Sequence, residues 1–421
     1  MREFEKDFMK KVMLLGAGDG QLPFLKICQS KGYKVIVVSV EGDYPCFKLA
    51  DKSYFIDTRD KDAILKVAVQ EKIDAILTDQ TDVSVPTVAY IAEKMNLRGI
   101  GYETALKFTD KYLMRKAAQK AGVGVPKFDK AFNFTEAVAV AENIGYPLVI
   151  KPADSSGSRG VRLINSVEDL KKEFGATQKF SNSGKVIVEG FIEGREFLVD
   201  GYAMDGEYWN LDLGVKEYFN CPGMYVSKMC MFSSVKRVKD RIGQLVLDAN
   251  KKLVHAMNLP FGITHAEYLY NEAEDKVYLV EIAARGGGVY LSSDLTPKAT
   301  NFNCNESLID YVAEGIVHKL NFDKLDDKVA LWLAFPFPAD GIIKKITGLE
   351  DLKNIDGVFK VVVKNIFDGK KVTKLADDSG KYAAVLISAD SEEKCYKIID
   401  EVKKTLEIEI ETADGIKTQI W

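Results

Sequence analysis

The first hundred residues alternate between short apolar runs and stretches of helix length, and this alternation limits the possible folds more than any other feature. Lys11 to Val40 reads as a strand, a glycine turn, a helix and a second strand. The pattern continues with an apolar run at 53–57, a helix over Asp60–Glu71, a strand over Ile73–Thr78 and a helix over Val83–Met95. Strands interleaved with helices of this length predict a parallel sheet with helices on both faces.

The length predicts more than one domain, because 421 residues are too many for one ordinary hydrophobic core. The α/β region ends near Gly101, and a helix opens the next region, capped by the run Thr109-Asp110-Lys111 and ending at Ala121. We expect an N-terminal α/β domain over 1–103, a central domain over 104–322 and a C-terminal α+β domain over 323–421.

Shorter patterns predict individual elements in the later domains. A capping-box pattern beginning at Ser166 predicts a short helix that ends at Gly175. In the last hundred residues, apolar runs at 361–363 and 382–387 read as strands, and Glu392–Leu406 reads as a helix.

Composition excludes several functional classes. A net charge of −4 gives no basic surface for nucleic acid. Six scattered cysteines without a CxxC pair favour reduced thiols over a disulfide framework, and three histidines argue against a histidine-rich zinc site. No apolar run reaches 18 residues and no secretory segment follows the charged start, so we expect a cytoplasmic protein without a membrane partner.

A candidate phosphate-binding loop follows an apolar run that ends at Ile150. Lys151 comes next, then a loop rich in glycine and serine, and a second apolar run begins at Val161. A lysine at a strand end, followed by many backbone N–H and hydroxyl donors, can hold a polyphosphate. Glycine lets the backbone approach the phosphates closely. Taken alone, the segment could equally be a hairpin loop with a surface lysine.

Two glutamates in strand-like runs form the strongest chemical pattern. The runs 263–270 and 276–285 flank a polar turn, so a hairpin would place Glu267 roughly opposite Glu281. Two facing carboxylates repel each other unless a cation lies between them, and Mg²⁺ is typically held by carboxylates and substrate phosphates. The alternative is two solvated glutamates and an Arg285 in a structural ion pair, although glutamate is depleted in strands.

Two weaker patterns lie elsewhere. The run 186–197 reads as strand, hinge and strand, where an adenine could bond to backbone groups, or alternatively as a β-turn with exposed acids. The loop beginning at Gly16 resembles a dinucleotide fingerprint, with Glu41 as a ribose ligand, but Gln21 stands where the third glycine is needed. We therefore interpret the loop as a tight turn rather than a nicotinamide site.

Together these elements resemble the ATP-grasp superfamily over nearly the whole chain. The run at 151–161 is most similar to members that ligate carboxylates to amines, including L-amino acid ligases. The resemblance implies a two-lobed ATP-grasp domain with its lid-bearing lobe at about 122–190, preceded by the α/β domain. It also implies ATP with Mg²⁺ or Mn²⁺ as cofactors, small-molecule carboxylate and amine substrates, and a homodimer.

The resemblance also implies roles for individual residues. Lys111 and Lys151 would contact the ATP phosphates, and Arg285 would stabilise the charge that moves between the γ-phosphate and the acyl group. Lys151 and Arg285 would be the catalytic residues, and Glu267 and Glu281 the metal ligands. The loop over the phosphates would contain Ser155, Ser156, Gly157, Ser158 and Gly160. Adenine and ribose would be bound by Glu189, Gly190, Ile192 and Glu196.

One departure from the family pattern concerns the metal. Many members have the motif E-x-N-x-R, whose asparagine is a further metal ligand, but this chain has Ala283 at that position. Alanine cannot ligate a metal. Either one of two metals is held more loosely, or another oxygen takes the place of the asparagine.

The implied reaction forms an acylphosphate from ATP and a carboxylate, which an amine then converts to an amide, releasing ADP and phosphate. Within the superfamily, a phosphoribosylglycinamide synthetase or a carboxyphosphate-forming enzyme is an alternative. A nucleotide sensor without turnover is a second alternative, although the two lysines, two glutamates and the arginine argue against it.

Overall fold

The protein is described by a computed structural model that covers residues 9–155, 157, 159–219, 226–288, 290–363, 366–375 and 383–421. It contains two compact units, each built from several segments of the chain. The first unit comprises the chain up to Asn210 with Arg241–Ser293 and Asn303–Leu320, and the second comprises Leu211–Asp240, Asp294–Phe302 and Asn321–Trp421. Within the described ranges, no helix is both long and apolar enough to cross a membrane. The three-domain division remains a prediction.

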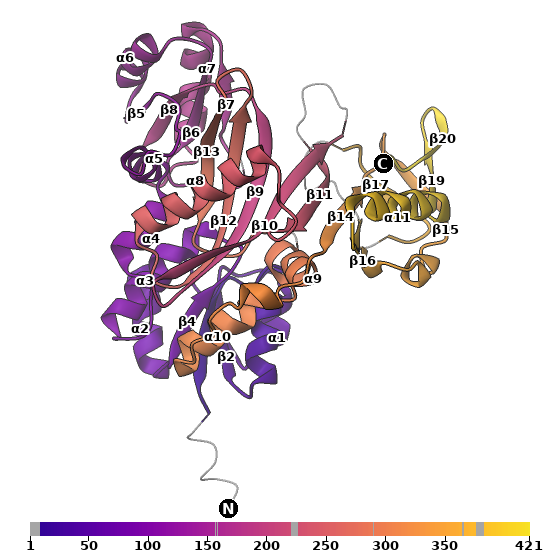
Figure 1. Cartoon of the computed structure of the whole chain (residues 1–421), viewed down its shortest axis with the longest axis horizontal. Coiled ribbons are helices and arrows are strands. Elements are labelled where there is room, and N and C mark those ends of the chain that lie inside the picture. The colour runs from indigo at the N-terminus through magenta and orange to yellow at the C-terminus, as the bar shows by residue number, and fades with distance from the viewer. Residues whose placement is uncertain are drawn as a thin grey trace, which may run out of the picture. The chain divides into compact units, whose positions relative to one another are not determined.

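The N-terminal part of the first unit is the parallel sheet that the alternation predicted. Its strand order is β3-β2-β1-β4, with α1 on one face and α2 and α3 on the other (Figure 1). Met13 and Leu15 point to the α2–α3 face, where they pack with Ile64 and Ile91. The elements are β1 (Lys11–Leu15), α1 (Leu22–Ser30), β2 (Lys34–Ser39), β3 (Lys52–Phe55), α2 (Lys61–Glu71), β4 (Ala75–Thr78) and α3 (Val85–Lys94).

An antiparallel sheet follows in the same unit and carries the segment that begins at Lys151. Its order is β5-β8-β6-β7, and α6 and α7 bury their apolar side chains against it. The elements are α4 (Tyr102–Thr109), α5 (Lys111–Lys120), β5 (Phe128–Ala131), α6 (Phe134–Ile144), β6 (Leu148–Pro152), β7 (Arg162–Ile164), α7 (Val167–Gln178) and β8 (Val186–Gly190). Lys151 therefore lies inside β6, one residue before the strand ends.

The prediction that a helix ends at Gly175 was wrong. Ser166 caps the helix as predicted, because its hydroxyl accepts the N–H of Asp169, but α7 continues to Gln178. Phe174 and Thr177 are buried on the inner face of α7, so packing carries the helix past the glycine. Gly175 itself is exposed, and nothing lies within 4 Å of the position that a Cβ would occupy there.

A second antiparallel sheet in the first unit carries the two glutamates. In it β12 lies between β13 and β9, and residue-by-residue pairing sets Glu267 opposite Glu281. A buried polar group supports this sheet from α8, where Asn250 donates to the hydroxyl of Tyr208 and accepts from that of Tyr268. The elements are β9 (Arg195–Met204), β10 (Glu207–Tyr218, in the first unit as far as Asn210), α8 (Arg241–Met257), β12 (Gly262–Asn271), β13 (Lys276–Ala283) and α10 (Cys304–Glu314).

The second unit is an α+β structure with its own core. Strands β11, β14, β18 and β16 are antiparallel neighbours, and α11 packs on β14 and β18. A separate sheet has the order β17-β15-β19-β20. The elements are β11 (Ser227–Ser234), α9 (Thr296–Thr300), β14 (Val329–Phe335), β15 (Gly341–Thr347), β16 (Val358–Val363), β17 (Lys371–Val372), β18 (Ala383–Ala389), α11 (Glu392–Thr405), β19 (Glu407–Thr412) and β20 (Gly415–Thr418).

The predicted fold class is confirmed, with a parallel α/β sheet at the N-terminus and antiparallel α+β structure after it. The three predicted elements of the last hundred residues are also present as β16, β18 and α11. Tyr382, which the sequence placed at the start of a strand, lies outside the described residues.

The corrected end of α7 gives a stability prediction. Gly175→Ala should raise the free energy of unfolding by about 0.5–1 kcal/mol, because alanine loses less backbone entropy than glycine in a helix interior. Gly184→Ala is the control, since Gly184 has a φ of +69° and alanine would be strained there. Urea denaturation of both variants measures the two changes in the free energy of unfolding. If Gly175→Ala destabilises as much as Gly184→Ala, the helix ends at Gly175.

Candidate active site

Lys111 brings the predicted phosphate loop and the predicted metal site together. It is the first residue of α5, and its Nζ atom lies 3.0 Å from Oε1 of Glu281 and 2.6 Å from the carbonyl oxygen of Ser155. Only 5% of Lys111 is exposed. The ammonium group thus connects β13 to the start of the serine- and glycine-rich loop.

Local structure fixes the position of Lys111. The carboxylate of Asp110 caps α5 by accepting the N–H groups of Tyr112 and Leu113. The backbone N–H of Lys111 donates to the carbonyl oxygen of Ala153 at 2.8 Å, and Lys185 pairs with Asp110 at 2.6 Å. Lys111 is therefore positioned both by its helix and by the end of the β6 segment.

Glu189 and its two cationic partners form a buried charge cluster. Glu189 is 3% exposed, its Oε2 lies 3.0 Å from Nε of Arg115, and its Oε1 contacts Nζ of Lys151. Burial alone would raise the pKa of Glu189, but the charges of Arg115 and Lys151 outweigh it and lower this pKa to about 2. The Glu189 carboxylate is ionised and fixes the direction of Lys151.

Arg285 is held by residues of the N-terminal sheet. Its Nη2 atom pairs with Oδ2 of Asp82 at 2.7 Å, while the neighbouring Gly286 donates its N–H to Oδ1 of Asp79 at 2.9 Å. Burial raises the pKa of Asp79 to about 7, because the Gly286 hydrogen bond and the charge of Arg285 offset only part of the desolvation. Both aspartates follow β4, so the end of this strand positions the segment after β13.

His265 lies between a buried aspartate and Glu267. Its Nδ1 is 2.8 Å from Oδ1 of Asp200, and its Nε2 is 3.8 Å from Oε1 of Glu267. Burial would lower the pKa of His265, but the charge of Asp200 outweighs it and raises the pKa to about 9. The imidazolium therefore donates to Asp200 and places positive charge beside Glu267.

The remaining residues predicted to bind ATP lie along two loops. Ser155, Gly157 and Gly160 lie between β6 and β7, and the two glycines have φ values of +67° and +76°. Ser156 and Ser158, which the sequence placed in the same loop, lie outside the described residues.

The predicted adenine and ribose residues lie at the junction of β8 and β9. Gly190 ends β8, Ile192 lies in the connecting hinge, and the half-buried Glu196 lies in β9. The N–H of Gly190 already donates to the carbonyl oxygen of Lys127 at 2.9 Å. Any adenine contact through Gly190 would therefore have to use another of its atoms.

The N-terminal glycine loop is closed by a side chain of its own. Oε1 of Gln21 accepts the N–H of Gly18 at 3.0 Å, and Nε2 of Gln21 donates to the carbonyl oxygen of Asp79. A Cβ at Gly16 would lie 2.8 Å from the Gln21 side chain. The glutamine that breaks the dinucleotide fingerprint thus fills the turn.

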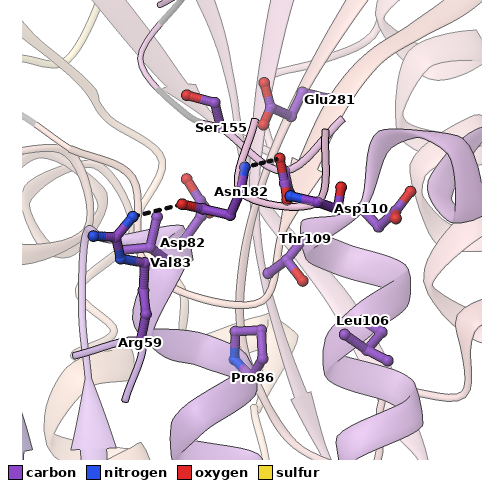
Figure 2. A pocket seen from close by; sticks show the side chains of 12 residues that line it. Arg59, Asp82, Val83, Pro86, Leu106, Thr109, Asp110, Ser155, Asn182 and Glu281 are labelled. Carbon is purple, nitrogen blue, oxygen red and sulfur yellow. Dashed lines mark hydrogen bonds between the residues drawn. The ribbon is translucent and has the colours of Figure 1, made fainter. Parts of the chain in front are cut away.

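A cavity of about 260 Å³ opens beside Glu281 in the first unit (Figure 2). Val83, Pro86 and Leu106 form its apolar side. The polar lining comes from Arg59, Asp82, Thr109, Asp110, Asp154, Ser155, Asn182, Ser183 and Glu281. The cavity therefore adjoins the loop after β6, Glu281 of β13 and the loops of the N-terminal sheet.

The carboxylates fit a magnesium ion that shares its coordination with a substrate. The described part of the chain has no group of three or more histidine, cysteine, aspartate or glutamate side chains placed to hold a metal. Glu267 and Glu281 supply hard oxygen ligands from paired positions, and Ala283 is 2% exposed and offers none. Two carboxylates together with substrate phosphates are a typical Mg²⁺ environment.

Sequence reasoning missed Arg115, Asp79, Asp82 and Asp200. Arg115 follows Lys111 by four residues, so the helical period could have placed both on one face of α5. Asp79 comes directly after the parallel strand β4 and Asp82 three residues later, at the sheet edge where ligands are commonly bound. Asp200 is an acid within an apolar strand, where it needs a partner.

Two family models match the chain. The model described as an ATP-grasp domain matches residues 144–293, and the model described as L-amino acid ligase C-terminal domain 2 matches residues 334–411. The first match includes Lys151, Glu189, Glu267, Glu281 and Arg285, and the second lies within the second unit.

Curated relatives are similar over different lengths. The chain is 27% identical to the C-terminal section of a carbamoyl phosphate synthase large chain from Methanopyrus kandleri, over 65% of this chain and 53% of that protein. It therefore spans about half the length of that relative. An L-arginine-specific L-amino acid ligase from Bacillus subtilis is 25% identical over 88% of this chain and 89% of the relative.

Solved structures share the fold over almost the whole chain. An L-amino acid ligase from Bacillus licheniformis superposes with a TM-score of 0.75 and 21% identity, covering 95% of this chain and 98% of that one. A phosphoribosylglycinamide synthetase from Anaerococcus prevotii superposes with a TM-score of 0.74 and 21% identity, covering 95% and 99%.

The buried cluster at Glu189 gives a second stability prediction. Arg115→Met should lower the free energy of unfolding by about 3–5 kcal/mol, because it leaves a buried carboxylate with one cation instead of two. Adding Glu189→Gln to Arg115→Met should recover part of the loss in urea denaturation, since the uncompensated charge is then gone. A double variant that is less stable than Arg115→Met would contradict this account.

The raised pKa of Asp79 gives a pH prediction. Between the ordinary value of 3.8 and about 7, the folded protein binds a proton that the unfolded chain releases, so stability from this group falls as pH rises through that window. Asp79→Asn keeps an oxygen that can accept the Gly286 N–H and abolishes this titration. Urea denaturation near pH 5 and near pH 7.5 should show a smaller loss of stability in the variant. If the wild-type protein and Asp79→Asn lose equal stability between the two pH values, the raised pKa of Asp79 is refuted.

Proposed function

Because the chain contains an ATP-grasp domain and an L-amino acid ligase C-terminal domain, we propose that it is an ATP-dependent carbon–nitrogen ligase. It joins a small carboxylate to a small amine and releases ADP and phosphate. The observation that carries the proposal is the position of Lys111, whose ammonium group contacts both the start of the phosphate loop and the metal-site glutamate. A phosphate-binding lysine, a glycine-rich loop and a carboxylate pair thus converge on one place.

The nucleotide is held by groups from two lobes. Lys111 and Lys151 contact its phosphates, and the loop from Ser155 to Gly160 covers them. Backbone groups of Glu189, Gly190 and Ile192 bind the adenine, and Glu196 binds the ribose. Glu267 and Glu281 would hold Mg²⁺, or Mn²⁺ in its place, since both ions accept carboxylate and phosphate oxygens. When bound, the metal neutralises charge on the phosphates.

The first chemical step transfers the γ-phosphoryl group. A carboxylate oxygen of the substrate bonds to the γ-phosphorus while the bond from that phosphorus to the bridging oxygen of ADP breaks, which gives an acylphosphate. Arg285, oriented by Asp82 at 2.7 Å, provides fixed positive charge where negative charge moves between the phosphoryl and acyl groups. Positioning and charge stabilisation suffice, so no side chain has to act as a nucleophile.

The second step forms the amide. The neutral amine bonds to the acyl carbon, the bond from that carbon to the phosphate oxygen breaks, and the proton lost by the nitrogen passes to the released phosphate. The substrates occupy the cavity beside Glu281. The volume of this cavity, about 260 Å³, suits compact molecules. Its apolar side at Val83, Pro86 and Leu106 accommodates an aliphatic group.

The match to the L-amino acid ligase C-terminal domain favours amino acids as substrates over a phosphoribosylamine. The similarity to an amino acid ligase over 88% of this chain supports the same choice. We also propose that the protein is a cytoplasmic homodimer that binds small molecules rather than nucleic acid or membranes.

A phosphate-release assay with Mg-ATP and a matrix of amino acids and small carboxylates tests the function. Release should require a particular pair of substrates, and Glu281→Gln should lower the rate at least about a hundredfold, because the metal that stabilises charge on the phosphates loses a carboxylate ligand. Glu173→Gln is the control, since Glu173 of α7 pairs with Arg162 and Lys172, which are 44% and 80% exposed. ATP binding without release for any pair would favour a nucleotide sensor. A rate in Glu281→Gln equal to that of the control would remove Glu281 from the mechanism.

A further inference from the structure

Arg59 belongs to the N-terminal part of the first unit and lines the cavity beside Glu281. It lies on the loop between β3 and α2, and its Nη1 atom donates to Oδ1 of Asn182 at 2.6 Å (Figure 2). Nε of Arg59 donates to Oδ1 of Asp57 at 2.9 Å, and Nη2 donates to the other oxygen of the same carboxylate. Because two donors engage one carboxylate, the guanidinium plane has a defined orientation toward Asn182.

Asn182 belongs to a short segment that holds one carboxylate. The backbone N–H groups of Asn182 and Ser183 donate to Oδ1 and Oδ2 of Asp154 at 3.1 and 2.8 Å. The hydroxyl of Ser181 donates to Oδ1 of Asp154 at 2.7 Å. Asp154 is thus bound by consecutive residues after α7, and the position of that segment determines the position of Asp154.

Asp154 immediately precedes the carbonyl group that binds Lys111. Nζ of Lys111 donates to the carbonyl oxygen of Ser155 at 2.6 Å and pairs with Glu281 at 3.0 Å. Arg59 is therefore connected to Glu281 in steps. Arg59 bonds to Asn182, and Asn182 bonds to Asp154. Asp154 is joined to Ser155 by a peptide bond, and Lys111 bonds to both Ser155 and Glu281. Arg59, Asp154, Ser155 and Glu281 also line the same cavity.

We propose that Arg59 is a positioning residue for the phosphate-binding lysine, acting through Asn182 and Asp154 on the Ser155 carbonyl and hence on Lys111. This inference rests on the proposed function. The loop after β3 therefore adjusts the affinity of the site for the ATP phosphates. It does so although Arg59 contacts neither Lys111 nor Lys151. A displacement of about 1 Å at a positioned group is enough to cost a large factor in rate.

The exposure of Arg59 separates this role from a structural one. Its side chain is 53% exposed and that of Asp57 is 39% exposed. Pairs this open to solvent contribute little to folding stability. Loss of the Arg59 side chain should therefore weaken nucleotide binding while leaving the unfolding transition almost unchanged, whereas a residue that only supports the fold would change both together.

The test compares Arg59→Ala, Arg59→Lys, Asn182→Ala and the Arg59→Ala/Asn182→Ala double variant with a matched control. Arg162→Ala is the control, because Arg162 of β7 pairs with Glu173 of α7 and its side chain is 44% exposed. Equilibrium binding of Mg-ATP is measured first, then KM for ATP and kcat with the substrates that the wild-type protein uses. Urea denaturation of every variant is run beside them.

Arg59→Ala and Asn182→Ala should each raise the Kd and KM for ATP about tenfold, and the double variant should be no worse than either, because both break the same series of contacts. Arg59→Lys should restore part of the affinity, and Arg162→Ala should match the wild type. Unchanged Kd in Arg59→Ala, or effects that multiply in the double variant, would overturn the inference.

Failure of the proposed function would look different. If the wild-type protein binds Mg-ATP but releases no phosphate with any pair of substrates, the ligase is refuted, while the Kd values still decide the role of Arg59. If the wild-type protein does not bind Mg-ATP, both the function and the inference fall.

Discussion

The pairing of β12 with β13 is the constraint on which the rest of the site depends. It sets Glu267 directly opposite Glu281, and two carboxylates at that spacing repel each other unless positive charge lies nearby. The structure supplies that charge from two directions, with Lys111 at 3.0 Å from Glu281 and His265 beside Glu267. A slip of one residue in the register would turn one glutamate to the other face of the sheet and separate the pair.

Opposite charges are paired throughout the site. Under the proposed function, binding of ATP and its metal would give these charged side chains new partners and would leave none of them unpaired. Glu189 lies between Arg115 and Lys151, and Arg285 lies against Asp82. Under the proposed function, the phosphates of ATP bring negative charge to Lys111 while the accompanying Mg²⁺ brings positive charge to Glu281. Each member of the Lys111–Glu281 pair thus gains a new partner, which avoids the large cost of an isolated buried charge.

Much of the fold and part of the candidate site could be predicted, because these features depend on local patterns in the sequence. The period of two in the hairpin predicted that Glu267 faces Glu281, and the alternation of strands and helices predicted the parallel sheet. The end of α7 was predicted wrongly because burial of Phe174 and Thr177 outweighs the weak helix propensity of Gly175. Local patterns mark Asp82 and Arg115 as candidate site residues but do not identify their partners, because Arg285 and Glu189 lie 203 and 74 residues away in the sequence.

Under the proposed function, Glu267 and Glu281 hold a divalent metal beside the ATP phosphates. The most direct measurement is a crystal structure of the protein with ADP and Mn²⁺, with anomalous diffraction used to locate the manganese. The account predicts an anomalous peak within ligand distance of a carboxylate oxygen from each glutamate, at about 2.0–2.6 Å, and of the nucleotide phosphates. Bound ADP with the manganese elsewhere, or with neither glutamate among its ligands, would contradict it.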